Sequence, residues 1–266
     1  MKRITSIDAL RAVTLWGILV VHTAGLFGFN NPKNEFLYFS DLDTSLIWIT
    51  QVLLSKRCAA IFSILFGVSF YLILKNPQNT SGKFLWRCFL LTLIGLFNKI
   101  FYTYDALMWY GLCGMMLVAF RKLSVRKLQI SFVVLFLATM ATSLFDLGTL
   151  IFGRDSYSRY GIQATFGDIV SYPLLLSVAD YLRTVFDSGV FKTLSYFVLG
   201  YLFGRLGVIE RLEQTLTVKR LFVLFFFYFI SLTVFYLLKL YVLFPIAMLL
   251  GALFYASLFI YIYNKQ

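Results

Sequence analysis

The sequence is poor in charged residues, histidine, cysteine and proline. Charged residues fill 14% of the 266 positions, and the chain has one histidine, three cysteines and four prolines. Soluble domains carry about 25% charged residues, so the composition excludes a water-soluble globular protein. The scarcity of proline excludes collagen-like and proline-rich disordered chains. The three cysteines each lie inside an apolar run, which predicts neither a disulfide framework nor a zinc site.

Apolar residues fill 60% of the chain. They come in blocks near the length that crosses a bilayer, about 20 residues, and only helices suit such blocks. We therefore predict an all-α, polytopic transmembrane helix bundle in a single domain, residues 1–266. Two shorter pieces, 46–54 and 169–186, are predicted to be interfacial or re-entrant helices. The eight predicted spans are 12–29, 58–74, 84–102, 106–120, 128–152, 191–206, 221–238 and 243–263.

The basic residues predict the orientation in the membrane. With the N-terminus in the cytoplasm, fifteen of the 24 lysines and arginines fall on the inner side, and four of them form the cluster from Arg121 to Lys127. Basic residues gather at the cytoplasmic ends of spans, so we expect an N-in, C-in, multi-pass protein of the inner (cytoplasmic) membrane. The net charge of +12 then indicates contact with anionic membrane lipids. The sequence has no nucleic-acid-binding module.

His22, the only histidine, lies past the middle of the first predicted span. Arg11 precedes it by eleven residues, about three helical turns, so both side chains lie on one helix face about 16 Å apart along the axis. An arginine fork suits phosphate, and a neutral imidazole can accept a proton from an attacking hydroxyl. This spacing suits acyl-coenzyme A, which has phosphates at one end and a thioester at the other. The structural alternatives are a histidine bonded to a neighbouring helix and an arginine paired with Asp8.

The same residues carry a family resemblance. Residues 6–12 (SIDALRA) and 20–22 (VVH) resemble the opening of the transmembrane acyltransferase-3 proteins, which have an arginine, ten intervening residues and a histidine in their first span. Residues 61–70 (IFSILFGVSF), 93–96 (LIGL), 104–107 (YDAL), 110–111 (YG) and 197–205 (FVLGYLFGR) resemble the YeiB-like bacterial membrane proteins of the same superfamily. The family-like core is then 5–207, and the C-terminal helices occupy 219–264.

The resemblance implies an integral membrane acyltransferase. It would move an acyl group, often acetyl, from cytoplasmic acyl-coenzyme A to a hydroxyl of an envelope glycan or lipid-linked sugar, with His22 as the base and Arg11 as the carrier contact. Similar sequences continue with further helices beyond the position of Gln266, so a partner membrane chain is an expected alternative for completing the bundle. Similar sequences also often have a histidine at the position of Asn98, and we assign Asn98 as a substrate contact.

Four other polar residues are candidates for roles in this site. Asp105 is a candidate partner for His22, or a helix N-cap. Arg57, with Lys56, is a candidate contact for an anionic acceptor, or a helix anchor. Arg183 is a candidate acceptor contact, or part of an ion-pair ladder with neighbouring aspartates. Arg205 is a candidate phosphate contact, or a snorkelling residue beside closely packed glycines.

The sequence has no phosphate-binding glycine loop, no zinc motif and no Gly-x-Ser-x-Gly elbow, so we expect no metal. Two alternatives from other functional classes stay open. In a transporter or flippase, His22 and Arg11 would line a translocation path. A non-catalytic membrane subunit is the third.

Overall fold

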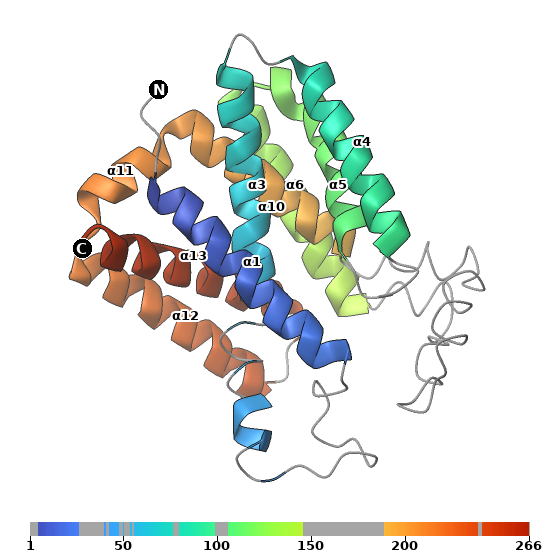
Figure 1. The fold of residues 1–266 in the computed structure, drawn as a ribbon. Coiled ribbons are helices and arrows are strands. Elements are labelled where there is room, and N and C mark those ends of the chain that lie inside the picture. Colours follow the sequence, from blue (N-terminus) through green and yellow to red (C-terminus); the bar gives the residue numbers. More distant parts are fainter. Residues whose placement is uncertain are drawn as a thin grey trace, which may run out of the picture.

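The computed structural model is a bundle of helices (Figure 1). Within the described part of the chain, all regular secondary structure is helical, with two short 3-10 turns and no strand. The helices are α1 (Thr5–Leu26), α3 (Arg57–Lys75), α4 (Ser81–Asn98), α5 (Leu107–Leu117), η1 (Val118–Lys122), α6 (Val125–Phe145), α10 (Gly189–Leu206), α11 (Val208–Thr215), α12 (Val218–Leu238), η3 (Tyr241–Leu243) and α13 (Phe244–Tyr263). The structure describes residues 5–26, 40, 43–47, 50, 54, 56–76, 80–98, 106–145, 189–238 and 241–265.

Local sequence signals explain several helix ends. Thr80 directly precedes α4, and Ser124 directly precedes α6. The hydroxyl of each accepts a hydrogen bond at 3.4 Å from the backbone N–H three residues later. Such capping supplies a partner for an N–H that has none inside the helix. Gly207 separates α10 from α11 with a φ of 61°, a left-handed conformation that glycine adopts without a steric penalty. Pro245 lies in the first turn of α13, where its missing N–H is not needed.

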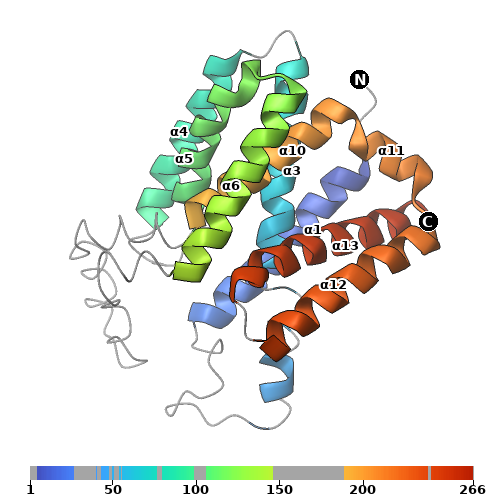
Figure 2. The same cartoon turned by 180° about the vertical axis from the view of Figure 1, so that it is seen from behind.

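Helices α3 and α10 form the centre of the bundle and run parallel to each other. Gly200 lies against the backbone of Ile64, Gly67 against that of Phe197, and both approaches are too close for a side chain. Small residues of this kind let two helix backbones approach closely inside a membrane. The two views show the other helices placed around this pair (Figures 1 and 2).

Two groups of buried side chains flank the α3–α10 pair. One joins α3 and α10 to α4, α5 and α6, and it includes Phe70, Phe84, Cys113 and Phe197. The other joins α3 and α10 to α1 and α13. The central pair therefore contributes to both cores and links α1 and α13 to α4, α5 and α6.

The eight predicted spans each overlap a described helix, and the all-helical prediction is confirmed for the residues that the structure describes. Five helices are long and apolar enough to cross a membrane: Thr5–Ala24, Arg57–Lys75, Val125–Ser143, Val218–Leu238 and Phe244–Tyr263. These helices make the chain a membrane protein by length and composition. The count of eight spans and the N-in, C-in topology stay predictions. Helix α1 begins at Thr5, seven residues before the start of the predicted span at residue 12. Asp8 and Arg11 therefore lie within helix α1.

Candidate functional site

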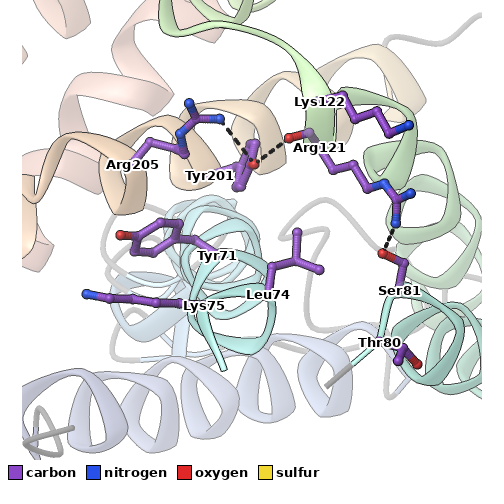
Figure 3. Close-up of a pocket in the computed structure, with 9 residues that line it drawn as sticks. All are labelled: Tyr71, Leu74, Lys75, Thr80, Ser81, Arg121, Lys122, Tyr201 and Arg205. Atoms are coloured by element: carbon purple, nitrogen blue, oxygen red, sulfur yellow. Dashed lines mark hydrogen bonds between the residues drawn. The ribbon is translucent and has the colours of Figure 1, made fainter. Parts of the chain in front are cut away.

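One end of the bundle contains a pocket of about 620 Å³. Its walls come from the end of α3, the start of α4, η1 and the end of α10 (Figure 3). We call it the basic pocket, because four of the described residues that line it are cations and none is acidic. These residues are Tyr71, Leu74, Lys75, Thr80, Ser81, Arg121, Lys122, Tyr201 and Arg205.

Tyr201 organises the arginines of the basic pocket. Its hydroxyl donates a hydrogen bond to the backbone carbonyl of Arg121 at 3.0 Å and accepts one from Arg205 Nη1 at 3.4 Å. Arg205 Nη1 also donates to the carbonyl of Leu123 at 3.2 Å, and Arg121 donates to the hydroxyl of Ser81. Figure 3 shows the bonds of Tyr201 with Arg121 and Arg205, and the bond from Arg121 to Ser81, joining α10, η1 and α4 around the opening. The arginines are thus held in place by neutral groups, which leaves their positive charge uncompensated by these contacts.

The basic pocket has the chemistry of a phosphate site. Arginine offers planar paired donors, lysine adds a mobile point charge, and the hydroxyls of Thr80 and Ser81 lie beside the positive end of α4. The sequence predicts a phosphate contact for Arg205 alone among the four cations. Arg121 and Lys122 also belong to the basic cluster from Arg121 to Lys127. Such a cluster is equally expected at the cytoplasmic end of a membrane span, so it did not by itself indicate a phosphate site.

Arg11 is not among the described residues that line the basic pocket. Its two terminal nitrogens donate to Asp8 Oδ1 at 2.7 Å and to Ser69 Oγ at 2.8 Å. Ser69 in turn donates to the carbonyl of Leu65 at 2.6 Å. The pairing with Asp8 matches the structural alternative for Arg11, and the bond to Ser69 adds a link from α1 to α3. The carrier-phosphate role of Arg11 stays a prediction.

His22 lies on α1, which is one continuous helix from Thr5 to Leu26 and also contains Arg11. The imidazole is half-buried. Five residues earlier, Gly17 packs tightly against Cys58 at the start of α3. His22 is therefore near the end of the bundle where α3 begins, and the basic pocket is at the end where α3 finishes.

Arg57 is buried, with 4% of its surface exposed. Its guanidinium carbon lies 5.9 Å from the centre of the Tyr228 ring. Lys56 directly precedes it, and its ammonium interacts electrostatically with that of Lys192 on α10. We call Lys56, Arg57 and Lys192 the Lys56–Lys192 cluster. Partial removal from solvent, and then the adjacent charge of Arg57, lower the pKa of Lys56 below its usual range. Nothing in the sequence marks Lys192 as part of this site, because it lies 135 positions after Arg57 and has no basic residue beside it.

The remaining predicted site residues are less informative. Asn98 is the last residue of α4 and is half-buried. Asp105 and Arg183 lie outside the described residues, so the predicted pairing of Asp105 with His22 stays a prediction. Within the described ranges, no group of three histidine, cysteine or acidic side chains is placed to hold a metal ion.

Comparison with known proteins adds relatives without an assigned activity. No protein-family model matches the chain, and no solved structure matches it. It is 30% identical over 176 residues to an uncharacterized 39.9 kDa protein in the amylase 3' region of Bacillus acidopullulyticus, covering 60% of this chain and 47% of the relative. It is 28% identical over 148 residues to the uncharacterized protein YxaH of Bacillus subtilis, covering 51% of this chain and 37% of that relative.

The chain therefore matches less than half the length of either relative. Both relatives are uncharacterized proteins.

Proposed function

We propose that this protein is an integral membrane acyltransferase of the inner membrane. It takes an acyl group from cytoplasmic acyl-coenzyme A and transfers it to a hydroxyl of an envelope glycan or lipid-linked sugar. The basic pocket carries the proposal, because it gathers four cations from separate segments at one end of a membrane bundle. In this scheme Lys75, Lys122 and Arg205 hold the phosphate at the adenosine end of the carrier, and Arg121 helps to shape the opening. Arg11 lies between this pocket and His22, about 16 Å from His22 along α1, and is the proposed contact for the phosphates nearest the thioester arm.

The chemical step needs one base. His22 accepts the proton of the acceptor hydroxyl, whose oxygen then forms a bond to the thioester carbonyl carbon. The carbon–sulfur bond breaks, and the sulfur of coenzyme A leaves with the electron pair and takes up the proton from His22. Asp105 is proposed to orient the imidazole. Asn98 and Arg183 are proposed acceptor contacts. A partner membrane chain remains part of the proposal for completing the bundle.

Binding of coenzyme A by the purified protein tests the proposal. The protein is placed in phosphatidylcholine nanodiscs and titrated with coenzyme A and with pantetheine, which lacks the phosphates. We expect coenzyme A to bind, pantetheine to bind much more weakly, and each of Arg205→Gln and Lys75→Gln to weaken coenzyme A binding about tenfold. That value follows from a charged hydrogen bond worth about 1.5–3 kcal/mol.

Lys219→Gln is the matched control, because Lys219 is an exposed cation on α12 outside the described lining of the basic pocket. It should leave coenzyme A binding unchanged. Absence of coenzyme A binding, or equal binding by the Lys75→Gln/Arg205→Gln double variant, would overturn the proposal.

A transporter of anions is the second candidate. Arg57 and Lys192 lie where α3 and α10 begin, and Lys75 and Arg205 lie where they end. A path for an anion through the bundle would require cations at both ends in this way. Uptake of an anion into proteoliposomes without any dependence on acyl-coenzyme A would favour this candidate.

A further inference from the structure

The Lys56–Lys192 cluster lies where two parallel helices begin. Lys56 directly precedes α3, Arg57 is its first residue, and Lys192 is in the first turn of α10. Because α3 and α10 run in the same direction and touch along their length, their N-terminal ends lie at the same end of the bundle (Figure 1). The basic pocket is at the other end, about 27 Å away along α3 at 1.5 Å per residue.

The electrostatics of this position disfavour cations. The N-terminal end of a helix carries a partial positive charge and stabilises anions. Here two such ends adjoin three cationic side chains, and the ammonium groups of Lys56 and Lys192 repel each other. Within the described part of the chain, no carboxylate pairs with Lys56 or Lys192. An anion between them would relieve the repulsion.

The surroundings of the cluster are aromatic and hold a buried polar group. The ammonium of Lys56 lies 4.4 Å from the centre of the Phe244 ring. Tyr196 is one turn beyond Lys192 on the same face of α10, and 2% of it is exposed. Its hydroxyl has no hydrogen-bond partner among the described residues, although a buried hydroxyl is normally paired. The turn of α10 that follows Lys192 therefore holds a hydroxyl without a partner among the described residues.

We propose that the Lys56–Lys192 cluster binds a phosphate group. Lysine ammonium groups and the planar fork of Arg57 are the usual protein partners of phosphate, and two helix N-terminal ends add their partial charges. The phosphate belongs either to a lipid headgroup or to a soluble or glycan-borne phosphate ester, which share this chemistry.

The cluster lies on the His22 side of the bundle. Gly17 packs against Cys58, the residue after Arg57, and His22 is five residues further along α1, about 7.5 Å along the helix axis. A role of the cluster in the reaction rests on the proposed function. In that role the cluster holds a phosphate carried by the acceptor while His22 acts on the hydroxyl of the acceptor. The binding itself is independent of that function.

The test uses inorganic pyrophosphate as the probe. Binding is measured on the protein in phosphatidylcholine nanodiscs, in a Lys75→Gln/Arg205→Gln background that disables the basic pocket. We expect this background to retain pyrophosphate binding, and the added Lys56→Gln/Lys192→Gln pair to weaken it about 100-fold, about tenfold for each ammonium removed. Lys127→Gln/Lys219→Gln removes two exposed cations elsewhere and should change nothing.

Two further measurements sharpen the result. Thermal unfolding of Lys56→Gln/Lys192→Gln in the wild-type background is measured, where a cooperative transition like that of the wild type shows that the variant is folded. Nanodiscs containing phosphatidic acid identify the source, because retention of this lipid by the wild type and its loss from the variant assign a lipid headgroup. Pyrophosphate binding without such retention assigns a soluble or glycan phosphate.

The two proposals fail separately. If the Lys75→Gln/Arg205→Gln background binds no pyrophosphate, or binds it equally well after Lys56 and Lys192 are replaced, the phosphate site at the cluster is wrong. If the wild type binds pyrophosphate through the cluster but does not bind coenzyme A, the site stands and the acyltransferase proposal fails.

Discussion

Arg11 and Ser69 join the first helix to the central helix. The guanidinium of Arg11 on α1 donates to the hydroxyl of Ser69 on α3 at 2.8 Å, and its other terminal nitrogen pairs with Asp8 at 2.7 Å. The ion pair is partly exposed, at 29% and 34% of the two side chains, so its net strength is reduced by water. The bond fixes α1 against α3 about 9 Å along the helix axis from Lys75 of the basic pocket.

Ser69→Ala should lower the thermal unfolding temperature in detergent, and Arg11→Ala should lower it further. The first change removes one bond to a charged donor, and the second also removes the cation that pairs with Asp8. Arg11→Lys should restore part of the loss, since one ammonium cannot reach both partners with the same planar geometry. If Arg11→Ala unfolds like the wild type and instead loses coenzyme A binding, Arg11 is a carrier contact, as the sequence predicts.

Gly200→Ala should destabilise the bundle. A methyl group at this position would overlap the carbonyl group of Ile64 on α3, and overpacking of this kind typically costs about 1–3 kcal/mol. Gly82→Ala is the matched control, because the nearest atom to its added methyl group is Thr80 Oγ1 at 3.7 Å. Alanine stabilises an exposed helix position by up to about 1 kcal/mol relative to glycine, so Gly82→Ala should not destabilise the protein. Equal unfolding temperatures for the two variants would contradict the close packing of α3 and α10.

His22→Ala should abolish acyl transfer and leave the protein folded. Loss of a general base typically lowers the rate about 10²–10⁴-fold, and alanine inserts into a membrane more readily than histidine. Transfer from radiolabelled acyl-coenzyme A measures the rate. Thr23→Ala is a suitable control, since the exposed Thr23 hydroxyl donates only to the carbonyl of Leu19 in its own helix. Full transferase activity in His22→Ala would remove His22 from the mechanism.

Tyr201→Phe should weaken coenzyme A binding without unfolding the protein. The change removes the hydroxyl that Arg205 donates to and that holds the Arg121 carbonyl, but keeps the ring. Loss of positioning costs less than loss of the charged contact itself, so we expect an effect of about 0.5–1.5 kcal/mol and a rise in the dissociation constant of about two- to tenfold. Because Tyr201 acts by positioning Arg205, the loss should be smaller in the Arg205→Gln background. An equal loss in both backgrounds would show that Tyr201 acts independently.

Cysteine labelling tests the predicted orientation. Lys122→Cys lies in the cationic cluster predicted to be cytoplasmic, and Asp155→Cys lies in a loop predicted to be outside. A membrane-impermeant thiol reagent applied to intact cells should label only the second position. The native cysteines are buried and give a low background. Labelling of both positions from one side would overturn the N-in, C-in topology.

The sequence was a good guide to features that depend on neighbouring residues. Helices form through hydrogen bonds between residues four apart, and membrane insertion depends on the apolarity of a continuous run. The predicted blocks therefore overlap the observed helices, although α1 begins earlier because Asp8 and Arg11 pair within it. The sequence also predicted correctly that Arg11 and His22 lie on one helix, since both belong to one continuous segment.

The sequence by itself thus determined the helical class, the apolar segments and the presence of Arg11 and His22 on one helix. The tertiary structure decided which distant side chains meet. It brought Lys75, Lys122 and Arg205 to one pocket, set Lys192 within electrostatic range of Lys56, and gave Arg11 a partner 58 residues away in Ser69. The positions of Lys75, Arg205, Lys56 and Lys192 depend on the close packing of α3 against α10 at Gly67 and Gly200. That packing depends on the shapes of two helix surfaces that are far apart in the sequence.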